Sequence, residues 1–113
     1  MWRVSELLVE KPINVQVIGE SSTSLLVTWD INVNSSSSSA AAASYYRVFF
    51  YELTNLVSGE MDVTAEQRQA VINDLCQLCE YNVQVVAYAV NGTSHSSDEV
   101  TGRTLSDGKF SFT

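Results

Sequence analysis

Residues 73–93 read NDLCQLCEYNVQVVAYAVNGT. Apolar and polar side chains alternate over residues 80–90, which is typical of a β-strand with one buried face. Asn91 and Gly92 follow, a pair that favours a tight hairpin turn. The side chains predicted to face the core are Tyr81, Val83, Val85, Ala87 and Ala89.

The same kind of pattern recurs on both sides of this strand. Turn residues separate the β-prone runs at intervals of about ten residues, which favours an antiparallel sandwich. Residues 31–44, INVNSSSSSAAAAS, are predicted to form a loop, and Ser58-Gly59 a turn. Residues 64–75 have weak helical spacing but no apolar stripe wide enough to pack. Further strands are expected at residues 13–18, 24–30, 45–52, 68–72 and 99–104.

The totals limit the classes of protein that the chain can be. Its 113 residues suffice for one domain, and its net charge of −7 disfavours binding to nucleic acid. No apolar run approaches the roughly 20 residues of a membrane span, so direct membrane insertion is not expected. The first ten residues do not read as a signal peptide, because Glu6 interrupts their short apolar stretch.

Several motifs then line up in order. Pro12 leads into N-V-x-V, and S-L-L-V-T-W ends in Trp29. L-C-Q-L-C-E-Y-N-V-Q-V-V-A-Y contains Tyr81, and residues 91–94, NGTS, precede a closing Thr104. Together these motifs resemble a fibronectin type III domain over residues 12–104.

The resemblance implies a fold and a division of the chain. The expected fold class is all-β, an immunoglobulin-like sandwich of two antiparallel sheets with about seven strands. Residues 1–11 would be an N-terminal linker, residues 12–104 the domain, and residues 105–113 a C-terminal tail or linker. The structural core would include Trp29, Leu75 and Tyr81, whose hydroxyl would bond the backbone a few residues upstream as a tyrosine corner.

The resemblance also implies a function. The chain would be a non-catalytic extracellular module of an adhesion protein, receptor or matrix protein, acting through protein partners or as a spacer. The alternatives are an accessory module of a secreted multidomain enzyme and an intracellular scaffold module. No cofactor is expected. Ser94, His95 and Asp98 are too close in sequence to converge as a catalytic triad.

Cys76 and Cys79 precede a strand rather than open a helix, which argues against a redox motif. A structural zinc site needs about four ligands, and His95 is predicted to lie in the opposite loop, so a metal site is not expected. Two alternatives remain for this pair: a short disulfide across the turn, or two free thiols. An extracellular setting favours the disulfide, which would supply the rigidity that proline gives in members of the family.

Two glycosylation sequons, at Asn34 and Asn91, fall in predicted loops. Such triplets also arise by chance in a serine-rich chain, so they lend only mild support to a secreted protein.

Strand parity within residues 45–52 predicts a protein-contact surface. If Tyr46, Val48 and Phe50 point inward, their neighbours point outward together with two residues of the next long strand. Aromatic surface patches mark interaction sites, although aromatic residues also pair across strands for stability. An arginine beside aromatic residues suits a partner with a carboxylate or an aromatic face. The candidate contact residues are Tyr45, Arg47, Phe49, Tyr51, Val86 and Tyr88.

Overall fold

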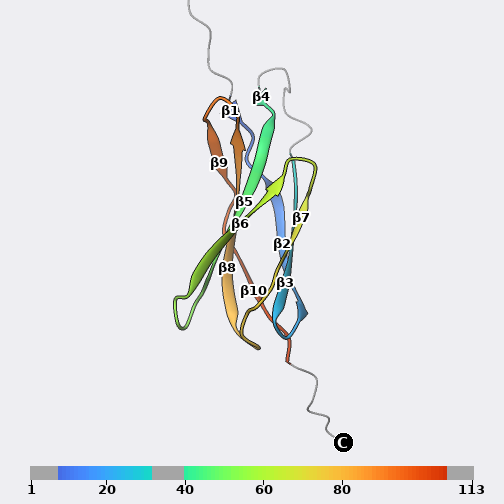
Figure 1. Ribbon diagram of the computed structural model, residues 1–113, viewed down its shortest axis with the longest axis vertical. Coiled ribbons are helices and arrows are strands. Elements are labelled where there is room, and N and C mark those ends of the chain that lie inside the picture. The colour runs from blue at the N-terminus through green and yellow to red at the C-terminus, as the bar shows by residue number, and fades with distance from the viewer. Residues whose placement is uncertain (1–7, 32–39, 107–113) are drawn as a thin grey trace, which may run out of the picture.

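The computed structural model describes residues 8–31 and 40–106 and arranges them as an elongated sandwich of strands (Figure 1). These residues contain no helix that could cross a membrane. The strands in chain order are β1 (Leu8–Val9), β2 (Ile13–Ser21), β3 (Ser24–Asp30), β4 (Ala40–Ala41), β5 (Ala43–Glu52), β6 (Ser58–Thr64), β7 (Gln69–Ile72), β8 (Glu80–Ala89), β9 (Ser94–Ser96) and β10 (Val100–Arg103).

Two antiparallel sheets form the two layers of the sandwich. The smaller sheet has the order β2-β3-β7, and the larger has the order β10-β8-β5-β6 with β9 also paired to β8. β9 and β10 share one edge of β8, where β10 pairs with residues 80–83 and β9 with residues 86–88. The predicted all-β, two-sheet antiparallel fold is confirmed.

The core lies between the inner faces of the two sheets. Trp29 of β3 packs against Tyr46 of β5, with ring centroids 5.4 Å apart and an interplanar angle of 59°. This contact joins the two sheets at the centre of the sandwich. The predicted core residues Trp29, Leu75 and Tyr81 are all buried.

The edges of the sandwich are closed by tight contacts. Gly102 of β10 lies so close to Val17 of β2 that a Cβ at residue 102 would overlap the valine side chain. At the opposite end, β1 pairs in parallel with β4. Val9 of β1 falls within the predicted N-terminal linker, yet it is buried in the core cluster.

Three predictions about local structure are wrong. Ser58 and Gly59 begin β6 rather than forming a turn, and the chain reverses at residues 53–57 instead. A Cβ on Gly59 would lie 2.6 Å from Cζ of Phe50, so the glycine leaves room for the ring of Phe50. β4 and the start of β5 lie within the predicted loop 31–44, and His95 lies on β9 rather than in a loop.

Candidate functional site

The outward side of the larger sheet carries most of the predicted contact residues. Along β5, Tyr46 and Val48 are buried, so the alternating positions between and beside them face outward. We call these half-buried residues and their neighbour on β8 the aromatic face. Its members are Tyr45, Arg47, Phe49, Tyr51 and Tyr88.

The expectation that Val86 belongs to this surface is wrong, because its side chain is only 6% exposed. Val86 faces outward but lies in the middle of the sheet, opposite Arg47 on β5 and Ser96 on β9. Its short side chain therefore has a neighbouring strand on each side, with the longer arginine side chain across from it. The outward direction of the Val86 side chain was predicted correctly, but its burial was not.

Two tyrosines and one arginine form the centre of the aromatic face. The rings of Tyr45 and Tyr88 stack with centroids 4.9 Å apart and an interplanar angle of 11°. The guanidinium carbon of Arg47 lies 5.7 Å from the Tyr45 centroid and 5.4 Å from the Tyr88 centroid. Cation–π attraction at such distances holds the three side chains in one arrangement.

Asp62 of β6 forms an ion pair with the guanidinium of Arg47. Nε and Nη2 of Arg47 donate hydrogen bonds of 2.6 Å and 3.1 Å to the two carboxylate oxygens. These bonds lower the pKa of Asp62 and raise the pKa of Arg47 from their ordinary values. A carboxylate of the chain itself therefore already pairs with the guanidinium of Arg47, and the contact of Arg47 with a partner stays a prediction.

A shallow, open hollow of about 560 Å³ adjoins the aromatic face beside β6. Asp62 lies opposite Arg47 in the register of β5 and β6, and both side chains contribute to the lining. This hollow was not predicted, because no strand was expected at residues 58–64. The alternation E-M-D-V-T over residues 60–64 is the signal that could have located it. The lining residues are Ser44, Tyr45, Arg47, Asp62, Val63, Thr64, Ala65 and Glu66.

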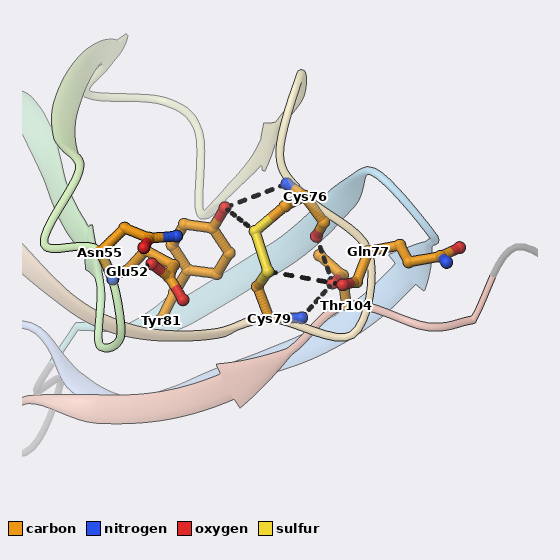
Figure 2. Close-up of a disulfide and its surroundings, with 7 residues drawn as sticks. All are labelled: Glu52, Asn55, Cys76, Gln77, Cys79, Tyr81 and Thr104. Atoms are coloured by element: carbon orange, nitrogen blue, oxygen red, sulfur yellow. Dashed lines mark hydrogen bonds between the residues drawn. A yellow bond between two sulfur atoms is a disulfide. The ribbon is translucent and has the colours of Figure 1, made fainter.

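The crossover between β7 and β8 is the second feature that the sequence singled out (Figure 2). Cys76 and Cys79 form a disulfide with a Cα–Cα distance of 5.7 Å. The hydroxyl of Tyr81 accepts a 3.2 Å hydrogen bond from the amide of Cys76. Thr104 Oγ1 donates to the carbonyl oxygen of Cys76 at 2.6 Å and accepts from the amide of Cys79 at 3.1 Å. The disulfide, the Tyr81 hydrogen bond and the two Thr104 hydrogen bonds therefore hold this turn.

Replacing Tyr81 with phenylalanine should lower the free energy of unfolding by about 1–2 kcal/mol, because the amide of Cys76 loses its acceptor. Urea denaturation followed by circular dichroism measures the change. The matched control is Tyr51→Phe, whose hydroxyl accepts a longer bond of 3.3 Å from Asn82 on the outer side of the sheet. A Tyr81→Phe midpoint equal to that of the parent chain would show that this hydrogen bond does not stabilise the fold.

Reducing the disulfide should lower the free energy of unfolding by about 2 kcal/mol or less, because the loop it closes is very short. The comparison is denaturation of the oxidised chain with and without a phosphine reductant. The double variant Cys76→Ser, Cys79→Ser serves as the control, since the reductant should leave it unchanged. Intact-mass analysis that finds two free thiols in protein made under oxidising conditions would contradict the bridge.

Among the residues that the structure describes, the ligand atoms of Glu52, Cys76 and Cys79 lie within 4.8 Å of one another. Both sulfur atoms are in the disulfide, and a disulfide sulfur is not a thiolate ligand. Glu52 is buried, and its Oε1 accepts a hydrogen bond from the amide of Asn55 in the turn between β5 and β6. In the oxidised chain this carboxylate therefore orders a turn.

The remaining candidate positions are the two sequons and His95. Asn34 falls outside the described residues. Asn91 is exposed, and its Oδ1 accepts hydrogen bonds from the amide and the hydroxyl of Thr93 at 3.1 Å and 2.8 Å. His95 is exposed, with Nδ1 3.2 Å from the carbonyl oxygen of Val9.

Comparisons with known proteins agree with the geometry. The fibronectin type III domain model matches residues 10–103. Human neogenin is 32% identical over 94 residues, which are 83% of this chain and 6% of neogenin. The human netrin receptor DCC is 29% identical over 103 residues, which are 90% of this chain and 7% of the receptor. The chain thus spans only a small part of the length of these relatives.

Solved structures show the same fold at lower identity. The fibronectin type III domain of human collagen alpha-1(XX) chain superposes with a TM-score of 0.75 and 20% identity, covering 96% of each chain. The corresponding domain of human contactin 1 gives a TM-score of 0.75 and 19% identity, covering 99% of this chain and 92% of the other. With the match to the family model, the two-sheet topology and the tyrosine hydrogen bond at the crossover, these findings show that the chain belongs to the fibronectin type III family.

Proposed function

We propose that this chain is a non-catalytic, extracellular protein-contact module of a larger receptor, adhesion or matrix protein, and that it binds its partner through the aromatic face. Its sequence similarity to neogenin and to a netrin receptor supports a receptor setting. The exposed sequon at Asn91 and the disulfide at the crossover are both compatible with secretion.

The observation that carries this proposal is the ordered arrangement of Tyr45, Arg47 and Tyr88 on the outer side of the larger sheet. Tyrosine and arginine are enriched among the residues that dominate binding energy in protein interfaces. Their side chains are held by stacking and by the ion pair to Asp62, so little conformational entropy remains to be lost on binding. A pre-ordered aromatic cluster of this kind is suited to a specific protein contact.

Phe49→Ser and Tyr88→Ser should each abolish binding of the module to cells that carry its partner, while the domain stays folded. The measurement is cell-surface binding of the fluorescently labelled module, tetramerised on streptavidin. Unfolding is measured in parallel, and losses of stability within about 1 kcal/mol are expected, as for most surface substitutions.

The matched control is Ile18→Ser, which removes a 51%-exposed apolar side chain from β2 in the other sheet. This control should bind as the parent chain does. The contact face is assigned to the wrong sheet if Ile18→Ser abolishes binding and the two aromatic substitutions do not. Unfolding of both aromatic variants would show that these side chains act as core, and the proposal would fall.

A further inference from the structure

The charges on the outer side of the larger sheet do not balance. Its two described arginines, Arg47 and Arg103, are each held by a carboxylate of the chain, Asp62 and Glu80 respectively. Three exposed glutamates on this side and its rim have no ion pair in the described part of the chain. They are Glu60, Glu66 and Glu99. The surface beside the aromatic face is therefore acidic.

The hollow beside β6 is lined by both apolar side chains and carboxylates. Its lining combines apolar surface from Tyr45, Val63 and Ala65 with the carboxylates of Asp62 and Glu66. Since Arg47 neutralises Asp62, Glu66 is the carboxylate of the lining that forms no ion pair among the described residues. Lysine and arginine side chains bury an aliphatic stem against apolar surface and keep their charge near a carboxylate. The lining of the hollow fits that kind of side chain.

We propose that the partner is a protein with a basic contact segment, and that it places a lysine or arginine side chain in the hollow while its neighbouring residues cover the aromatic face. This inference rests on the proposed function. A second copy of the chain is disfavoured as the partner, because each copy carries a net charge of −7 and like charges repel. A partner that offers a carboxylate is disfavoured because Arg47 is already paired.

The test uses two acetylated peptides, Gly-Lys-Gly-Lys-Gly-Lys and its counterpart with glutamate in place of lysine. Each is titrated into the ¹⁵N-labelled chain, and amide chemical shifts report the site. The lysine peptide should shift the amides of Ser44, Tyr45 and residues 64–66 saturably, and the glutamate peptide should not. Glu66→Gln should lower the affinity for the lysine peptide by about two- to five-fold, the usual range for one exposed ion pair.

Two further variants sharpen the result. Glu20→Gln removes the same charge from β2 in the smaller sheet and should leave the affinity for the lysine peptide unchanged. Asp62→Asn leaves Arg47 without its carboxylate, so the lysine peptide should bind more weakly and the glutamate peptide should begin to bind. The inference is overturned if Glu20→Gln weakens binding as much as Glu66→Gln, or if shifts spread over both sheets. Either result would mean that the net charge alone attracts the peptide.

The cell-surface assay separates this inference from the proposed function. If Phe49→Ser abolishes cell binding but Glu66→Gln and Asp62→Asn do not alter it, the aromatic face is the contact and the basic partner is wrong. If cell binding survives Phe49→Ser, the contact face itself is wrong. Sedimentation that finds the parent chain as a dimer through this sheet would replace the basic partner with a second copy.

Discussion

Replacing Trp29 with alanine should lower the free energy of unfolding by about 3–5 kcal/mol, the usual cost of deleting a large aromatic side chain from a core. Trp29 is 1% exposed and forms the central contact between the two sheets through the ring of Tyr46. Removing it leaves a cavity that the neighbouring strands cannot fill, because their backbones are fixed by the sheet hydrogen bonds. Urea denaturation followed by far-ultraviolet circular dichroism measures the loss.

Trp29→Phe is the matched control for this prediction. The indole Nε1 is buried and has no hydrogen-bond partner among the described residues, so phenylalanine removes volume without breaking a hydrogen bond. Its cost should be about half that of alanine or less, because a ring remains against Tyr46. An alanine variant within about 1 kcal/mol of the parent chain would contradict the central position of Trp29.

Replacing Thr104 with valine should lower the free energy of unfolding by about 2–3 kcal/mol, because two backbone groups at the crossover lose their partner together. The side chain is 1% exposed and bonds both the carbonyl oxygen of Cys76 and the amide of Cys79. Valine keeps the shape of threonine but neither donates nor accepts. The loss should appear as a lower denaturation midpoint with an unchanged denaturant slope.

The control for this prediction is Thr101→Val on β10, the strand that ends immediately before Thr104. Thr101 is exposed, and its hydroxyl donates to Oδ1 of Asn82 on the outer side of the sheet, where water can replace the bond. Its cost should stay within about 0.5 kcal/mol. Equal losses for the two variants would mean that Thr104 does not act through the crossover.

Periodicity predicted those strands in which apolar and polar residues alternate within the strand itself. The alternation around Tyr81 and Val83 requires only that one face be buried, so it can be read without knowing the neighbouring strands. The outward positions of Tyr45 and Phe49 follow from the same period. The core position of Trp29 came from the resemblance to the fibronectin type III family rather than from periodicity.

The candidate site depended on pairings that a single strand does not encode. Asp62 binds Arg47 because β6 and β5 are aligned in one register, which the sequence analysis did not predict. The glycine at residue 59 looked like a turn signal, yet it serves the packing of Phe50. Val86 alternates like an exposed residue, but it lies between two other strands. Long-range register, rather than local pattern, determined these outcomes.

Site-specific photo-crosslinking tests the contact face most directly. p-Benzoylphenylalanine is placed in one preparation at residue 49 on the aromatic face and in another at residue 18 on the smaller sheet, and each labelled module is irradiated on partner-bearing cells. The predicted result is one discrete crosslinked protein from residue 49, joined at a peptide with lysine or arginine beside the crosslinked position, and none from residue 18. Crosslinking from residue 18 to a discrete protein, with none from residue 49, would contradict the aromatic face as the site of contact.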